Sequence, residues 1–127
     1  MNEEEYNKLS SSTIGAAIEV HKELGPGLLE AVYEECLLSE LKAKGLKVES
    51  QVKLPIIYKG KELSKVFIID LLVEDKLIIE LKAVENILPV HEVQLVTYLK
   101  LSGKKLGLLI NFNESVLKHG IRRRINS

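Results

Sequence analysis

The stretch FIIDLLVEDKLIIELKA, residues 67–83, decides the fold and raises the main question about function. Its apolar residues form two runs separated by the polar residues 74–76, the pattern of two strands joined by a short turn. Three charged residues, Asp70, Glu80 and Lys82, interrupt these runs. An isolated ionised carboxylate inside a protein costs several kcal/mol or more. Each of the three charges therefore needs a partner that compensates it.

Side-chain alternation places Glu80 and Lys82 on one face of the second strand. A three-residue turn, 74–76, puts Asp70 directly opposite Glu80, whereas a two-residue turn puts Asp70 opposite Leu81 and separates the carboxylates. With the three-residue turn, we expect both carboxylates to converge on one face of the sheet, with Lys82 beside them. The opposite positions are wholly apolar and are predicted to be core: Ile69, Leu71, Val73, Leu77, Ile79 and Leu81.

Two ionised carboxylates that face each other across a strand pair repel. A divalent cation between them reverses the sign of that interaction, and Mg²⁺ takes carboxylate, carbonyl and water oxygens as ligands. The alternative is that Asp70 and Glu80 form salt bridges with Lys82 or with another lysine, without a metal. The pattern D-x(9)-E-x-K alone does not separate these two interpretations.

Length and composition indicate one globular domain. The chain has 127 residues, of which 46% are hydrophobic and 28% charged, and no apolar run approaches the roughly 18 residues of a membrane span. The first twelve residues are acidic and polar, unlike an export signal, so we expect a soluble, cytoplasmic protein with a polar N-terminal extension over residues 1–10. Eighteen basic residues balance eighteen acidic ones, so any nucleic-acid surface must be local.

The order of predicted elements describes a single α/β domain with a central mixed sheet of about four to five strands flanked by helices. Helices are predicted over about 10–24, 28–44 and 90–102, and strands over about 46–58, 64–74, 77–83 and 105–112, with a further edge strand over 120–126. Pro55 lies inside the first predicted strand, which indicates an edge position or a bulge.

Further polar residues recur at helical spacing. Gln94 and Tyr98 lie four apart on one face of the last helix, with His91 a turn earlier. Glu30 and Tyr33 lie three apart near the start of the second helix, where a carboxylate also gains from the helix dipole. Two other features, His21 and the basic segment KHGIRRRIN (118–126), have a structural or solvated role as their simpler explanation.

These residues carry a family resemblance. GPGLLEAVY, with Gly27, Glu30 and Tyr33, resembles the signature of the GxxExxY protein family. The order Glu30, Asp70, Glu80-x-Lys82, Gln94-x-x-x-Tyr98 is similar to the RecB-like branch of the PD-(D/E)xK nuclease superfamily. The resemblance covers roughly residues 12–126 and implies a restriction-endonuclease-like core.

The resemblance also implies a role for each matching residue. The carboxylates of Asp70 and Glu80 and the main-chain carbonyl of Leu81 are expected to bind Mg²⁺ or Mn²⁺, with Glu30 completing the metal shell. Lys82 is expected to contact the attacking water or the scissile phosphate. Gln94 and Tyr98 are expected to line the same site, and Ile69 stands where the motif's name has proline.

The sequence thus predicts a metal-dependent phosphodiester hydrolase acting on nucleic acid, with DNA as the first choice and RNA as an alternative. The second hypothesis is a binding protein and not an enzyme: a non-catalytic module that has the same fold and binds nucleic acid or protein. A homodimer is compatible with the sequence, which does not fix the oligomeric state. We expect Glu30 and Gln94, from two different helices, to lie around the pocket of Asp70.

Overall fold

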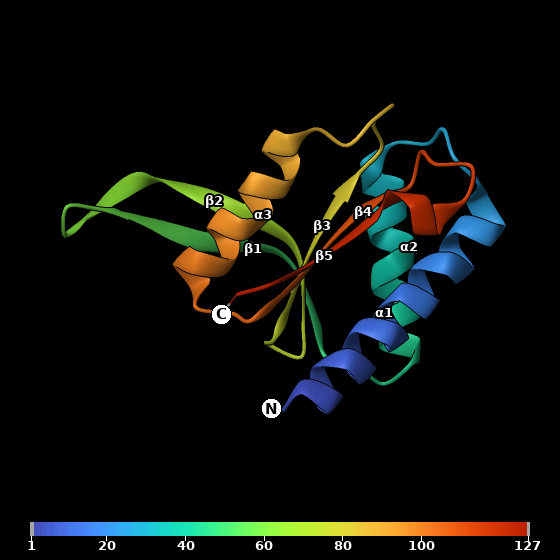
Figure 1. The fold of residues 1–127 in the computed structure, drawn as a ribbon, viewed down its shortest axis with the longest axis horizontal. Helices are drawn as coiled ribbons and strands as arrows, with labels where there is room; N and C mark the ends of the chain where they lie inside the picture. Colours follow the sequence, from blue (N-terminus) through green and yellow to red (C-terminus); the bar gives the residue numbers. More distant parts are fainter. Residues whose placement is uncertain (1, 127) are drawn as a thin grey trace.

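The structure, a computed structural model, describes residues 2–126 and contains every predicted element (Figure 1). Its helices and strands are α1 (Glu3–Leu24), α2 (Glu30–Ala43), β1 (Val48–Tyr58), β2 (Lys61–Val73), β3 (Leu77–Lys82), α3 (Pro89–Ser102), β4 (Leu106–Asn111) and β5 (Ile121–Ile125), with a short 3₁₀ helix (Leu117–Gly120) before β5. None of these helices is both long and apolar enough to cross a membrane, over the residues described.

The first helix begins earlier than predicted. It starts at Glu3, not near residue 10, because the Asn2 side chain accepts a hydrogen bond from the Glu5 N–H at 2.9 Å and caps the helix. Acidic residues in the first turn add to this through the helix dipole. The structure places residues 3–10, expected to be a polar extension, in the first turns of α1, where Leu9 and Ser10 are buried.

The five strands form one mixed sheet in the order β1-β2-β3-β4-β5. Neighbouring strands are antiparallel except β3 and β4, which run parallel and are connected through α3. The single α/β domain with a helix-flanked mixed sheet confirms the predicted fold class.

Helices cover both faces of the sheet, with α1 and α2 on one side and α3 on the other (Figure 1). The helix α3 lies so close to β4 that a Cβ on Gly107 would come within 2.8 Å of the Leu95 side chain. Two apolar cores result. The α1/α2 core includes Ala17, Leu37, Leu71, Ile79 and Leu108, and the α3 core includes Ile69, Leu72, Ile78, Leu95 and Leu109.

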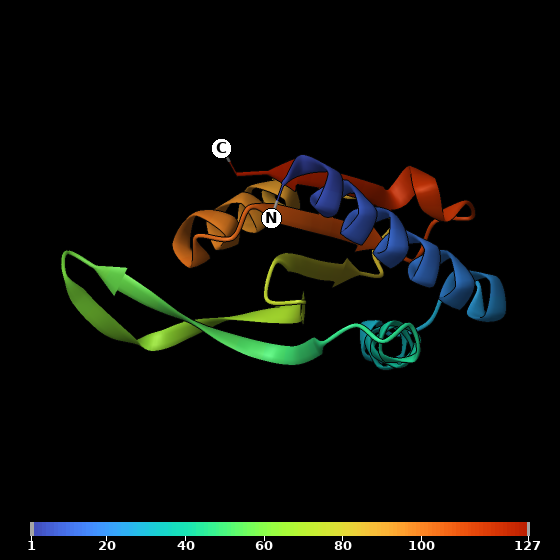
Figure 2. The ribbon, with the colours of Figure 1, turned by 90° about the horizontal axis from the view of Figure 1, so that it is seen from below.

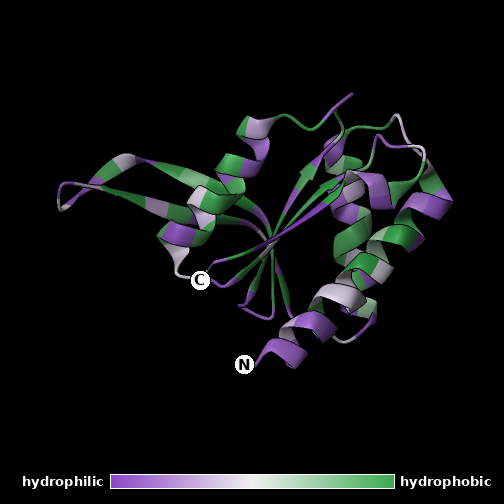
Figure 3. Ribbon diagram, in the orientation of Figure 1, coloured by the Kyte–Doolittle hydropathy of each residue, from purple (hydrophilic) through white to green (hydrophobic). Residues whose placement is uncertain are grey.

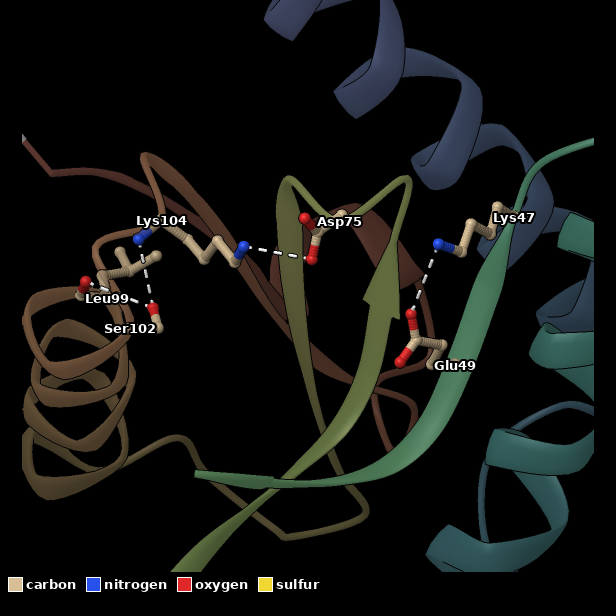
Figure 4. Close-up of polar contacts among 6 residues, drawn as sticks. All are labelled: Lys47, Glu49, Asp75, Leu99, Ser102 and Lys104. Atoms are coloured by element: carbon tan, nitrogen blue, oxygen red, sulfur yellow. Dashed lines mark hydrogen bonds and ion pairs between the residues drawn. The ribbon is translucent and has the colours of Figure 1, made fainter. Parts of the chain in front are cut away.

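The turn between β2 and β3 has three residues, as predicted, because Val73 pairs with Leu77. Glu74 and Asp75 adopt positive φ angles of 52° and 57° to close it. Lys104, at the start of the segment leading into β4, holds this turn through an ion pair of 3.1 Å to Asp75 (Figure 4). This contact lowers the pKa of the Asp75 carboxyl.

Strands β1 and β2 continue well beyond β3 as a two-stranded ribbon, which we call the arm (residues 52–69). The arm projects away from the body of the protein (Figures 1 and 2), and every residue from 57 to 66 is exposed. The register shifts between Pro55 and Ile57, so the predicted irregularity at Pro55 on this edge strand is confirmed.

One predicted core position faces the other way. Ile69 packs in the α3 core, whereas Leu71 and Val73 pack in the α1/α2 core. The ribbon twists where the arm begins, opposite Gln51, whose φ of 52° lies in the left-handed region. Strict alternation therefore fails at this point of β2, between Ile69 and Leu71.

Candidate active site

The arm separates from β3 at Asp70 and Glu80. Main-chain pairing of β2 with β3 ends at Leu71 and Ile79, so the next two residues along the same register are this acidic pair. Their side chains bridge the opening strands. Glu80 Oε2 accepts a hydrogen bond from the Asp70 N–H at 2.9 Å, and Asp70 Oδ2 accepts one from the Leu81 N–H at 2.8 Å. The structure thus brings the two predicted carboxylates together at a fork in the sheet.

Burial makes this pair electrostatically unfavourable. Glu80 is only 5% exposed, and desolvation, followed by the charge of Asp70, raises the pKa of its carboxyl to about 8. Desolvation also raises the pKa of Asp70, against the opposing effects of the Leu81 N–H and the Lys82 charge. The pair therefore tends to keep a proton between its members near neutral pH.

Lys82 follows two residues after Glu80, half-buried, and its charge lowers the pKa of both carboxyls. Its main chain is fixed on the β4 side, because the Lys82 carbonyl accepts the Phe112 N–H at 2.9 Å. Buried Asn111 secures the next segment by bonding both the N–H and the carbonyl of Val84, at 3.0 and 2.9 Å. Sequence reasoning did not identify Asn111, which carries no signal except its polarity in an apolar strand.

The salt-bridge alternative finds no support in this geometry. Three ion pairs occur within residues 2–126, Lys47–Glu49, Lys104–Asp75 and Arg124–Glu92. None involves Asp70, Glu80 or Lys82, so no lysine or arginine lies within ion-pair distance of these two acids in that range. Lys82 acts on both carboxyls from beyond ion-pair distance.

Helix α3 contributes Tyr98 to the site. Tyr98 is buried, with its ring 5.2 Å from that of Phe67. Burial, together with the charges of Glu80 and Asp70, raises the pKa of its hydroxyl to about 12. Gln94 lies one turn earlier and is half-buried, and its side chain forms no hydrogen bond with a residue in the described range. His91, in contrast, accepts the Leu88 N–H at its Nδ1, 3.0 Å away, and caps α3.

Helix α2 brings Glu34, which the sequence analysis did not name, near Asp70. Glu30 is exposed, and its charge acts on Glu34, one turn further along. Glu34 is half-buried, accepts a hydrogen bond from Gln51 Nε2 at 2.8 Å, and has a pKa raised by burial and by the charge of Asp70. Gln51 also lowers the pKa of Asp70. The i, i+4 spacing from Glu30 was the available signal for Glu34, and it was missed.

Tyr33 has a structural role. Its hydroxyl donates to the Gly25 carbonyl at 2.6 Å and accepts from the Leu28 N–H at 3.1 Å, while its ring stacks on Phe112 at 4.5 Å. Gly25 and Gly27 have φ angles of 69° and 98°, which favour glycine. The GPGLLEAVY segment is therefore an anchored turn that fixes where α2 begins. His21 supports the neighbouring segment, with its Nε2 2.7 Å from the Glu114 carbonyl.

Comparison with known families agrees with this site. A family model described as the PD-(D/E)XK nuclease superfamily matches residues 7–124. The chain belongs to the PD-(D/E)XK nuclease superfamily. Searches of the curated proteins and of the solved structures gave no match. Membership in the superfamily indicates nuclease-type hydrolysis of phosphodiester bonds and a nucleic-acid substrate.

The residues predicted to form the motif lie together at the fork. Ile69-Asp70 lies on β2, and Glu80-Leu81-Lys82 lies on β3. The donor set suits a hard divalent cation, because each carboxylate uses one oxygen for a main-chain N–H and has a second oxygen for another partner. No group of three His, Cys, Asp or Glu side chains arranged to hold a metal occurs in the part of the chain described, residues 2–126. The structure therefore does not assemble the expected set in which Glu30 completes a metal shell.

Proposed function

We propose that this superfamily member is a Mg²⁺- or Mn²⁺-dependent nuclease that acts on DNA. One observation carries the proposal: the buried Glu80 and half-buried Asp70 carboxylates approach each other at the fork without a basic side chain at ion-pair distance within residues 2–126. A chain that used this fold only as a scaffold would gain stability by replacing one acid. The costly arrangement is explained if Asp70 and Glu80 serve a reaction.

Each residue at the fork has a task in hydrolysis. Asp70, Glu80 and the Leu81 carbonyl are the proposed metal ligands. A divalent ion, when bound there, lowers the pKa of a water and neutralises charge on the phosphate. Lys82 orients the attacking water or a phosphate oxygen from the same face as Glu80. The Tyr98 hydroxyl, with its pKa of about 12, stays protonated and can donate a hydrogen bond to a phosphate oxygen.

The remaining groups hold these residues in place. Gln51 bridges Glu34 and Asp70 and so orients the Asp70 carboxylate. We further propose that Glu34, not Glu30, is the α2 carboxylate that tunes the site, through its charge and its hydrogen bond with Gln51. The anchored turn around Tyr33 supports placing the chain in the GxxExxY family and in the RecB-like branch, since it gives the G-x-x-E-x-x-Y spacing a structural reason.

A digestion experiment tests the proposal. Single-stranded, double-stranded and branched DNA, and RNA, are incubated with the protein in Mg²⁺, in Mn²⁺ or in chelator. Glu80→Gln is compared with Glu85→Gln, which changes an exposed glutamate in the segment after β3. We expect metal-dependent cutting of DNA by the wild type and by Glu85→Gln, and a loss of at least about 100-fold in Glu80→Gln. Binding without cutting in either metal would instead support the non-catalytic module.

A further inference from the structure

We propose that the arm, residues 52–69, is the element that grips the substrate, and that it lies along a DNA duplex beside the bond that is cut. This inference rests on the proposed nuclease function and adds to it the form of the substrate and the surface that holds it.

The arm is continuous with the site. Its last residue, Ile69, directly precedes Asp70, and the two strands project from the fork into solvent (Figures 1 and 2). Only the base of the arm is backed by α3, through Leu54 and Phe67 in the α3 core. A polymer that lies along the arm therefore passes the paired carboxylates.

Charge on the arm is basic although the chain as a whole is neutral. The arm contains four lysines and a single acidic residue, Glu62, and all five side chains are exposed. None of these lysines forms an ion pair with a residue in the described range. The lysines are Lys53, Lys59, Lys61 and Lys65, spread over both strands and the turn. Such a strip of free cations suits a phosphate backbone.

The arm also exposes apolar side chains to solvent, although their exposure does not stabilise an isolated ribbon. Ile57 and Tyr58 are 54% and 60% exposed near the tip, and hydrophobic and hydrophilic residues alternate along the ribbon (Figure 3). An isolated two-stranded ribbon is marginally stable in water, and such edges invite association. A partner that covers the arm resolves this. A second copy would bring four more lysines against these four, so a polyanion fits better than self-association.

The ribbon form favours a duplex over a single strand. The major groove of B-form DNA admits a two-stranded β-ribbon, whereas that of an RNA helix is too narrow for side chains to read. From Lys61 to Ile69 the strand has eight steps of about 3.3 Å, roughly 26 Å in all, or about eight base pairs at 3.4 Å each. The aromatic ring of Tyr58, with Lys59 Nζ 5.5 Å from its centre, lies at the far end of this span.

Binding measurements with matched triple variants test the arm. In a Glu80→Gln background, which prevents cutting, Lys53, Lys61 and Lys65 are changed to Gln in one protein, and Lys8, Lys42 and Lys44 in the other. The latter three are exposed lysines on α1 and at the end of α2. Affinity for a labelled 20-base-pair duplex is measured in Mg²⁺ by fluorescence anisotropy over a series of salt concentrations, and melting curves check that both variants fold.

We expect the arm variant to bind the duplex about tenfold or more weakly, with the slope of log K against log [salt] reduced by about one for each lysine that contacts a phosphate. The control variant should keep the slope of its parent. Equal slopes in the two variants, or no binding of duplex by the parent, would overturn the inference. An equal loss for single-stranded and duplex DNA would overturn its duplex part.

Cleavage kinetics, measured with proteins that keep Glu80, test the role of the arm separately from the proposed nuclease activity. The same three arm substitutions should raise KM and leave kcat nearly unchanged, and lengthening the flank beside the cut should lower KM up to about eight base pairs and no further. Weakened binding by the arm variant with no cutting by any protein would refute the nuclease and leave the arm as a DNA-binding element. A dimer seen by light scattering that only the arm variant disrupts, with DNA binding unchanged, would identify the arm as a self-association surface.

Discussion

Both edges of the sheet carry basic side chains, and the contacts of these side chains differ between the two edges. At the β5 edge, Arg122 Nη1 donates to the His119 carbonyl at 2.9 Å, Arg123 Nη2 donates to Asn7 Oδ1 at 2.7 Å, and Arg124 pairs with Glu92 of α3. At the β1 edge, the arm lysines project into solvent without ion-pair partners in the described range. The denser basic cluster in the sequence is thus the one already engaged within the fold.

The edges differ in a second way. The β5 edge closes onto α1 and α3 through these contacts, whereas β2 and β3 separate at a fork that holds the buried Glu80 and the half-buried Asp70. The β5 edge therefore contributes stability, whereas the paired carboxylates at the fork cost stability. Substitutions at the fork and at the β5 edge should therefore differ in their effects on activity and stability.

The largest effect is expected for Lys82→Met. Losing a group that orients or activates the nucleophile lowers kcat by about 10² to 10⁴, whereas Arg123→Met at the β5 edge should leave kcat unchanged. Cleavage of a duplex substrate in Mg²⁺ measures both, and metal-dependent melting shows whether the metal still binds. If the two variants cut equally well, the comparison between the edges fails.

The pH dependence of stability is the next largest effect. The pKa of Glu80 rises from 4.5 to about 8 on folding, so the folded state holds the proton more tightly and its stability falls as pH rises between these values. Glu80→Gln removes this dependence. In chelator, its unfolding free energy relative to wild type should increase from pH 5 to pH 8.5 by on the order of a few kcal/mol. Urea unfolding at a series of pH values measures it, and a constant difference would show that Glu80 is not buried as a strained acid.

Metal should stabilise the wild type by about 2.7 kcal/mol at one hundred times its Kd. Asp70→Asn keeps the acceptor for the Leu81 N–H but removes a charge, so without metal it should melt at the same temperature as wild type or higher, and metal should not stabilise it. Melting curves in chelator and in Mg²⁺ or Mn²⁺ decide this. A salt-bridged acid would behave in the opposite way, with a loss of roughly 3 to 5 kcal/mol in the variant.

The two glutamates of α2 give a matched pair of smaller effects. Glu34→Gln should weaken metal binding about tenfold, the usual lower bound for a group that orients a ligand. Glu30→Gln, one turn earlier and exposed, should change it by less than about twofold, because it acts on the site only through Glu34. Calorimetric titration with Mn²⁺ compares them. The reverse order would restore Glu30 as the metal-site residue.

The smallest effect is expected at the β5 edge. Arg124→Gln breaks the partly exposed ion pair with Glu92 and should lower the unfolding free energy by at most about 1 kcal/mol. Its kcat and its salt-dependent DNA binding should equal those of wild type. Weaker DNA binding in this variant would mean that the β5 edge also contacts substrate.

Local rules predicted most of the fold and part of the site. Hydrophobic periodicity and the turn residues predicted the order of the helices and strands. A three-residue turn at 74–76, one of the two turn lengths considered, predicted the strand register that places Asp70 opposite Glu80. The start of α1 was missed because its first turns carry a cap and a dipole interaction but little apolar pattern. Glu34 was missed because an i+4 neighbour of an expected residue looks like any exposed helix position until the helix is placed.

By itself, the sequence offered two turn lengths for the hairpin, of which the three-residue turn places Asp70 opposite Glu80 with a lysine two residues on, because strand alternation and turn length are local properties. The pairing of Val73 with Leu77 in the structure selects that turn. The sequence also determined the anchored turn before α2, since glycine at positive φ and a tyrosine within reach are short-range requirements. Only the tertiary structure decided which basic residues have no ion pair within residues 2–126, that Glu34 lies where the charge of Asp70 acts on it, and that the arm leaves the sheet at the acids. These outcomes depend on how distant segments pack, and side-chain partners such as Asn7 for Arg123 and Glu92 for Arg124 come from elements far away in the chain.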